Sequence, residues 1–269
     1  MSERLTAMQS FASNKENHPL HPTQKPTINR SRTLEETIIK DYGDSISATH
    51  ELKEQETSTN DCLRNHRVNE DLRAKMVDWM IEVLDIFNCS LRTLFLSIRV
   101  MDLYFKHEPS TIGVEELHVI GVSCMMIASK YEDIKALDMN TIFFKISHEK
   151  LPRAYIVRIE KKILKALDYK LFVPTVIDFL EPVLAETPKY MRNLVYYAAE
   201  LAQLEPKFAW IKPSLLAQAL YFLVFGNFGK AGLGDLVVVE VAAELRGFLN
   251  GFELGYQSTF NKYQMKPRF

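Results

Sequence analysis

The sequence predicts an all-α fold in which two helical bundles follow a disordered N-terminal tail. Apolar residues recur at helical spacing almost everywhere from residue 45 onward. No run longer than a few residues alternates apolar and polar side chains as a half-buried strand would. Each half of the chain also holds one segment that is apolar almost all round, ELHVIGVSCMMIASK in the first and KPSLLAQALYFLVF in the second. Such a segment suits the central helix of a bundle, enclosed by other helices.

The expected elements divide the chain into three parts. Residues 1–44 are rich in Ser, Thr, Asn, Lys, Glu and Pro, and they bury too little apolar surface to become ordered. A first bundle with a preceding helix is expected over 45–170, and a second bundle over 171–269. Short polar breaks separate the helices, which are expected at 45–57, 70–88, 92–107, 113–132, 139–147, 152–167, 175–185, 188–204, 213–226, 235–250 and 254–263.

Local signals support several of these boundaries. Pro152 suits the first turn of a helix, and Thr187 followed by Pro188 suits a capped helix start. The segment 168–174 is interpreted as the connector between the bundles. The glycine-rich stretch GNFGKAGLG lacks the spacing of a phosphate-binding loop and follows a helix, so an interhelical loop is expected there.

Composition excludes several classes of protein. Lys and Arg number 33 against 34 for Asp and Glu, so no overall positive field attracts nucleic acid or an anionic membrane. The three cysteines, Cys62, Cys89 and Cys124, are odd in number and lack CxxC spacing, which argues against a disulfide framework or a zinc knuckle. The longest apolar run, 119–128, is too short to span a bilayer, and no leading segment resembles a signal peptide. We expect a soluble intracellular protein without a cofactor or metal, and we find no catalytic set of residues.

The segment LRAKMVDWMIEVLDIF, residues 72–87, has an apolar arc of roughly 220° when it is drawn as a helix, twice the usual width. One interpretation is a helix buried on two sides within its own bundle. The other keeps Leu72, Met76 and Trp79 partly exposed as a docking groove, because exposed apolar patches often mark interaction sites. Both interpretations remain open at the level of sequence.

Arg73 lies inside this apolar arc, so its charge requires a partner. Asp102 is similarly enclosed by apolar residues in SIRVMDLYF and is the candidate partner. Loss of one member of such a buried pair costs about 3–5 kcal/mol. We expect a structural role for this pair.

Two further charged residues follow apolar surroundings. Lys130 lies in ASKYED, where an apolar helix becomes charged, and Glu160 lies beside Ile159 and Ile163 in YIVRIEKKILKAL. Taken alone, Lys130 could be a solvated helix end, and Glu160 could form ordinary helix-surface pairs.

Together these motifs resemble the cyclin box. LRAKMVDWMIEV is similar to the first-helix signature of that family, with Arg73, Asp78 and Trp79 in place, and Asp102, ASKYED, Glu160 and KLFVPTVIDFL follow in the family's order. The resemblance is to mitotic A/B-type cyclins, for which ASKYE and an N-terminal destruction signal are typical. The second half resembles the family mainly in PSLLAQA and FNKYQMKPRF. The fold that this implies is two tandem cyclin boxes.

The resemblance implies a regulatory subunit without catalytic activity. Cyclins bind a cyclin-dependent Ser/Thr kinase as a heterodimer and hold its αC helix and activation segment in the active arrangement, here in G2/M control. A transcription-associated cyclin is an alternative. A nucleic-acid-binding factor of cyclin fold is another, although the neutral charge and the absence of zinc-ribbon cysteines disfavour it. By resemblance the kinase-binding positions are Lys130, Tyr131, Asp133, Glu160, Tyr169 and Leu171.

The resemblance also implies a substrate-docking groove for protein substrates or inhibitors that carry an Arg-x-Leu peptide. Lys75 stands where the family usually has an apolar residue, and His118 replaces a usual Gln. A positive charge at the rim predicts weaker binding of basic peptides. The groove positions are Leu72, Met76, Trp79, Glu82, Leu117 and His118.

The stretch NKENHP in the tail resembles a KEN box, the degradation signal read by the anaphase-promoting ubiquitin ligase. Its residues are Lys15, Glu16 and Asn17. No Arg-x-x-Leu destruction box accompanies it in the tail, so the triplet is expected to act alone or beside a variant signal. The location expected from the resemblance is the nucleus and cytoplasm.

Overall fold

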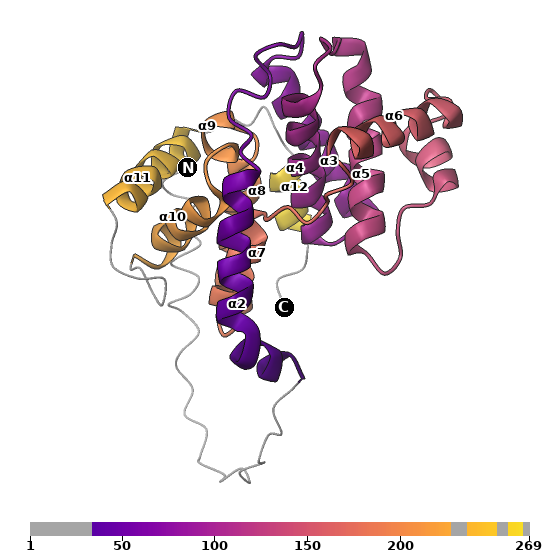
Figure 1. The fold of residues 1–269 in the computed structure, drawn as a ribbon. Helices are drawn as coiled ribbons and strands as arrows, with labels where there is room; N and C mark the ends of the chain where they lie inside the picture. Colours follow the sequence, from indigo (N-terminus) through magenta and orange to yellow (C-terminus); the bar gives the residue numbers. More distant parts are fainter. Residues whose placement is uncertain (1–33, 227–235, 252–257, 266–269) are drawn as a thin grey trace.

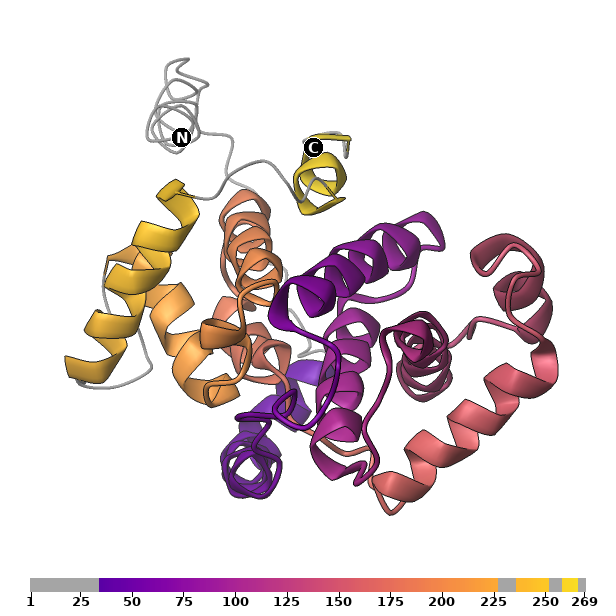
Figure 2. The ribbon, with the colours of Figure 1, turned by 90° about the horizontal axis from the view of Figure 1, so that it is seen from above.

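The computed structural model describes residues 34–226, 236–251 and 258–265, and every element in these ranges is helical. The helices form two groups that lie side by side, with α3 to α6 in one and α7 to α11 in the other (Figures 1 and 2). The all-α prediction and the division into two helical halves are therefore confirmed over the described residues. None of the helices in these ranges is long and apolar enough to cross a membrane.

The first helix corrects the predicted end of the tail. α2 spans Leu34–Glu56, whereas the sequence was expected to stay disordered up to residue 44. The segment LEETIIKDYGD contains many good helix formers, and its two glutamates lie near the helix N-terminus, where negative charge is favourable. Leu34, Ile38 and Tyr42 also recur every four residues, so the segment has the apolar spacing of a helix. The KEN triplet lies outside the described residues.

Polar caps set the starts of the two helices that carry the first-half motifs. α3 spans Glu70–Ile86, and the side chain of Asn69 accepts a hydrogen bond from the Leu72 amide at 2.9 Å. α4 spans Leu91–His107, and Ser90 caps it in the same way through the Thr93 amide at 3.1 Å. Side-chain caps of this kind satisfy amide groups that have no partner within the helix.

The centre of the first half is α5, Leu117–Glu132, which follows the short turn η1, Val114–Glu116. Apart from His118, its residues are buried from Leu117 to Ser129, as the all-round apolar pattern predicted. α4 packs on one side of α5 and α6, Arg153–Ala166, on the other (Figure 2). A π-helical turn, η2, covers Thr141–Ile146.

The second half surrounds α10, Pro213–Phe225, which contacts α7, α8 and α11. Residues 221–225 at its C-terminal end are only half-buried. α9 is a single helical turn that the sequence did not predict, because four residues carry too little periodicity to be recognised. The predicted helix at 254–263 starts outside the described residues, and its described part begins at Ser258. The remaining bounds are α7 Val176–Leu184, α8 Lys189–Ala202, α9 Pro206–Ala209, α11 Leu236–Gly251 and α12 Ser258–Met265.

Three elements connect the two halves. α4 packs against α7, and α12 packs against both α3 of the first half and α8 of the second. α2 runs beside α7, where the ring of His50 lies 5.5 Å from that of Phe172 and 5.9 Å from that of Phe179 (Figure 1). The halves are therefore joined through several independent contacts.

Candidate functional site

Lys130 and Glu160 form an ion pair across two helices. Lys130 lies in the last turn of α5 and Glu160 in the middle of α6, and Lys130 Nζ lies 2.6 Å from Glu160 Oε1. The Lys130 side chain is 50% exposed and that of Glu160 is 16% exposed. The neighbouring Tyr131 is also exposed, as is Ile134. The buried body of α5 thus ends in a charged pair beside exposed apolar groups.

Asp133 follows directly and has a local structural partner. Its Oδ1 accepts a hydrogen bond from the Ser90 amide at 3.0 Å, so it ties the end of α5 to the start of α4. The thiol of Cys89 lies in the same place. Burial, together with the nearby negative charge of Asp133, raises the pKa of Cys89 to about 12. This cysteine therefore stays protonated at neutral pH.

Tyr169 and Leu171 lie in the connector between α6 and α7. Asp168 and Tyr169 both adopt left-handed backbone conformations, with φ of 51° and 56°. This conformation costs roughly 1–2 kcal/mol for each residue that is not glycine. The turn is held by the Tyr169 amide, which donates to the Leu164 carbonyl oxygen at 2.8 Å. It leaves Tyr169 69% exposed, while Leu171 is half-buried.

The six groove positions lie on α3 and α5, but they are not equally exposed. Met76 is only 8% exposed and Leu117 5%, so the expectation that Met76 stays partly exposed is wrong. Its sulfur packs on Gly121, where an added Cβ would lie 2.5 Å from it. Leu72 and Trp79 remain half-buried. The helix is therefore buried on more than one side and keeps only part of its apolar arc accessible.

The accessible part of the groove carries aromatic and charged groups. The rings of Trp79 and His118 meet edge to face with centroids 5.0 Å apart. Burial, with a smaller effect of Lys150, lowers the pKa of His118. Lys75 is exposed and pairs with Asp71 one turn earlier at 2.6 Å, so part of its charge is compensated. Glu82 is exposed.

Arg73 and Asp102 form the predicted ion pair, and both side chains are buried. Arg73 Nε and Nη2 donate to the two carboxylate oxygens of Asp102 at 2.7 and 2.6 Å. Burial alone would lower the pKa of Arg73, but the charge and hydrogen bonds of Asp102 raise it above its ordinary value. The bidentate geometry is the arrangement that best compensates a buried guanidinium.

Sequence reasoning missed the groups that extend this pair into the second half. Arg73 Nη1 donates to the carbonyl oxygen of Gln203 at 2.7 Å, and Trp210 Nε1 donates to Asp102 Oδ2 at 3.2 Å. A main-chain carbonyl acceptor has no signature in the sequence. A tryptophan after a short unpredicted helix gave no indication of its partner either.

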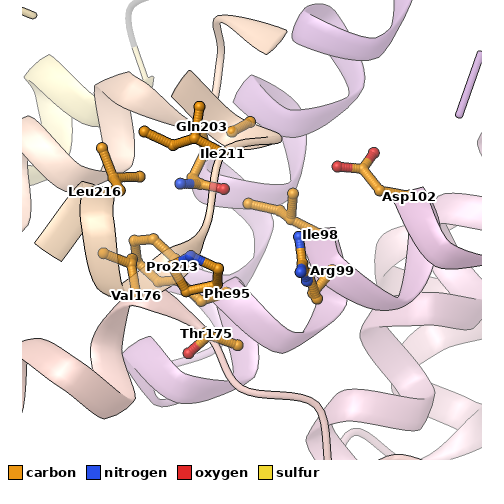
Figure 3. A pocket seen from close by; sticks show the side chains of 11 residues that line it. Phe95, Ile98, Arg99, Asp102, Thr175, Val176, Gln203, Ile211, Pro213 and Leu216 are labelled. Carbon is orange, nitrogen blue, oxygen red and sulfur yellow. The ribbon is translucent and has the colours of Figure 1, made fainter. Parts of the chain in front are cut away.

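A small cavity lies beside this junction (Figure 3). Its volume is about 20 Å³, close to that of a single water molecule. It is lined from the first half by α4 and from the second by the start of α7, by α9 and α10, and by the loops on either side of α9. The junction is therefore closely packed. The lining residues are Phe95, Ile98, Arg99, Asp102, Thr175, Val176, Gln203, Ala209, Ile211, Pro213 and Leu216.

Polar contacts also hold α2 and α12 against helices of the second half. Glu54 of α2 is buried, and its carboxylate accepts from the Ser214 amide at 3.0 Å and from its hydroxyl at 2.6 Å, at the start of α10. Glu200 of α8 is fully buried and pairs with Lys262, and it also accepts from the Tyr263 hydroxyl at 3.0 Å. Lys262 and Tyr263 belong to the terminal motif FNKYQMKPRF, to which the sequence had assigned no contact.

The described residues hold no group of three or more His, Cys, Asp or Glu side chains that could bind a metal ion.

Comparisons with known proteins show which family the chain is similar to. Residues 44–172 match the family described as "Cyclin, N-terminal domain". The chain is 32% identical over 187 residues to the G2/mitotic-specific cyclin S13-7 of Glycine max. The aligned region covers 68% of this chain and 72% of that relative. It is 29% identical over 251 residues to the G2/mitotic-specific cyclin S13-6 of the same plant, and this aligned region covers 88% of this chain and 55% of the relative.

The chain spans about half the length of several curated relatives that it matches. Among solved structures, the X-ray structure of a viral cyclin from herpesvirus saimiri superposes with a TM-score of 0.59. The superposition covers 83% of this chain and 97% of the other, at 18% identity. At that identity the likeness shows the fold alone, and the fold is consistent with two tandem boxes.

Proposed function

The chain belongs to the cyclin family, close to its mitotic members, and from this we propose that it binds and activates a cyclin-dependent Ser/Thr kinase in G2/M control. The chain would act as a regulatory subunit and would carry out no chemical step itself. A kinase needs its Lys–Glu pair and its metal-binding Asp in place, and both depend on the αC helix. A partner that binds only this arrangement shifts the kinase population toward it.

The observation that supports this proposal most directly is the ion pair of Lys130 and Glu160. A charged pair of which Lys130 is half exposed and Glu160 is partly buried offers a donor and an acceptor in a set geometry at the end of a rigid helix. Tyr131 beside it supplies exposed aromatic surface, which is enriched at protein interfaces. The relatives named as G2/mitotic-specific cyclins favour the cell-cycle role over a role in transcription.

The proposal is tested by kinase activity. A monomeric cyclin-dependent kinase from the same organism is incubated with ATP, a basic protein substrate and the chain, either wild type or with Lys130→Ala and Glu160→Ala. We expect stimulation by the wild type and a loss of about tenfold or more in the double variant, as for the central contacts of an interface.

A matched control removes a different exposed ion pair. Lys207 and Glu244 pair at 3.0 Å between α9 and α11, far from Lys130, and their side chains are 58% and 50% exposed, so this pair is at least as accessible as that of Lys130 and Glu160. Lys207→Ala with Glu244→Ala should leave the stimulation unchanged. Failure of the wild type to stimulate any of the organism's kinases would contradict the proposal.

The remaining family positions divide into two kinds. Tyr169 and Leu171 lie where a partner could reach them, and we include both in the proposed kinase surface. Asp133 is included as well, but its hydrogen bond to Ser90 means that it would act mainly by holding the end of α5 in place. Its substitution should therefore affect stability as well as binding.

We also include the groove in the proposal, as the site that recruits protein substrates or inhibitors. Leu72, Trp79 and His118 provide its accessible apolar and aromatic surface, and Glu82 provides negative charge. Met76 and Leu117 would support the groove from beneath. Lys15, Glu16 and Asn17 are proposed as the degradation signal for the anaphase-promoting ubiquitin ligase, and the proposed location is the nucleus and cytoplasm.

A further inference from the structure

The outward side of α6 is strongly basic, although the whole chain has a formal net charge of −1. Its cations are all exposed, and none forms an ion pair within the described ranges. They line a shallow hollow together with Ala154 and Val157. We call this surface the basic face of α6; its cations are Arg153, Arg158, Lys161, Lys162 and Lys165.

The basic face lies on the side of α6 opposite the core. The core side of the helix is formed by Ile156, Ile159 and Ile163, which are all buried. Glu160 is the only acidic residue in the helix, and it turns toward Lys130. α6 itself lies at the outer edge of the first half, on the far side from α10 and α11 (Figure 2). The face is therefore open to solvent and separate from the junction of the halves.

This arrangement is unfavourable for the helix alone. Arg153 is its first residue, and a cation near a helix N-terminus opposes the macrodipole by about 0.3–1 kcal/mol. Arg158 and Lys162 lie four residues apart, as do Lys161 and Lys165, and each like-charged pair of this kind costs about 0.2–0.5 kcal/mol. A negatively charged ligand bound on this side of the helix would offset these costs.

Two of the cations are already held in position. The guanidinium of Arg153 lies over the rings of Phe143 and Phe144, at 4.7 and 5.3 Å from their centroids. The guanidinium of Arg158 lies 4.7 Å from the ring centroid of Tyr155. Stacking on an aromatic ring orders an arginine without neutralising its charge. Less conformational entropy is then lost when an anion binds.

The spacing of the cations indicates the ligand. From residue 153 to 165 the helix extends about 18 Å, and the charges are spread along this length instead of converging on one point. A single phosphate group needs converging donors. A run of carboxylates on an extended segment of about six residues would match the spread. Ala154 and Val157 offer apolar contacts between the charges.

From these observations we propose that the basic face of α6 is a docking surface for an acidic segment, rich in Asp and Glu, of a partner protein. Nucleic acid fits the face less well. The aromatic rings that could stack on bases lie under the guanidinium groups of Arg153 and Arg158, and the chain as a whole has no positive field. The proposal requires no kinase and is tested on the chain alone.

The test measures binding of a fluorescently labelled peptide of Glu residues separated by Gly, about six residues long. Wild type is compared with one triple variant that carries Arg158→Glu, Lys161→Glu and Lys165→Glu, called the α6 variant. A control variant reverses three exposed cations elsewhere, Arg64→Glu, Arg67→Glu and Lys212→Glu, and so changes the net charge equally. Circular dichroism checks that both variants fold.

We expect the wild type and the control to bind alike, with an affinity that falls as salt is added, and the α6 variant to bind about tenfold more weakly. An equal loss in the control would overturn the proposal, because overall charge would then explain the binding. No binding by folded wild type would overturn it as well. Tighter binding of a peptide with one phosphoserine and no acidic run, or of single-stranded nucleic acid, would replace the proposed ligand class.

Discussion

Arg73 Nη1 donates a hydrogen bond to the carbonyl oxygen of Gln203 at 2.7 Å, so a side chain of the first bundle directly satisfies the main chain of the second. The same guanidinium is neutralised by Asp102, which also accepts from Trp210. One buried charge pair thus contributes to the core of the first half and to its junction with the second. Removal of the pair should destabilise both the core of the first half and its junction with the second.

Asp102→Ala should lower the free energy of unfolding by about 3–5 kcal/mol, because it leaves the Arg73 guanidinium buried without a counter-charge. Urea denaturation monitored by circular dichroism measures this loss. Asp71→Ala serves as the control, since it removes the exposed partner of Lys75 and should cost less than about 1 kcal/mol. Equal losses in the two variants would contradict a structural role for the buried pair.

Glu54→Ala should loosen α2 from the second bundle. The substitution leaves the Ser214 amide and hydroxyl without their acceptor, at a cost of about 1–3 kcal/mol. Hydrogen exchange should become faster in α2 and at the start of α10, while the amides of α5 keep their protection. Glu51→Ala removes an exposed carboxylate from the same helix and should leave the exchange pattern as it is.

His118 should make stability depend on pH. Its pKa in the folded chain is lowered from 6.5, chiefly by burial, so folding favours the neutral ring. The stability that this contributes is fully present above pH 6.5 and is lost as the pH falls through that value toward the folded pKa. His118→Gln should remove this part of the decline. Urea midpoints at pH 8, 6 and 5 test this, and parallel curves for the two proteins would refute it.

Lys75 should weaken docking of basic peptides in the proposed groove. Lys75→Ile should increase the affinity for an Arg-x-Leu peptide severalfold, within the range of about 0.2–1 kcal/mol for an exposed charge. Asp71→Ala should have the opposite effect, because Asp71 compensates the Lys75 charge. Fluorescence anisotropy with a labelled peptide measures both. Unchanged affinity in Lys75→Ile would show that the charge does not reach the bound peptide.

Long periodic helices and the buried pair could be predicted from sequence, whereas exposure and long-range partners could not. The apolar pattern of α5 predicted its burial, and Arg73 and Asp102 each stood out as a charge in apolar surroundings. The width of the apolar arc on α3 left the exposure of Met76 undecided, because an arc does not say which neighbour covers it. Glu200 has the same apolar setting as Asp102 but was not recognised, and its partners lie 62 and 63 residues away.

The start of α2 and the residues that complete the junction were missed by sequence reasoning for different reasons. Residues 34–44 contain Leu34, Ile38 and Tyr42 at helical spacing, but the sequence prediction included this short period in the polar segment that precedes it. Gln203 takes part through its carbonyl oxygen, which every residue possesses. The family resemblance placed Lys130 and Glu160 on one binding surface but did not predict their ion pair, because the two belong to different helices and neither residue alone indicates the other.

The polar contacts between the halves limit how the chain can be recombined. A chimera that joins the first bundle of this chain to the second bundle of a distant relative would lose the contacts of Trp210 with Asp102 and of Ser214 with Glu54 wherever the relative has other residues there. It would also have to hold the carbonyl oxygen at position 203 within reach of Arg73. The two bundles resemble each other in outline, but each depends on residues of the other where they meet. An exchange that preserves folding must transfer the contacting residues of both bundles together, whether it arises in the laboratory or in evolution.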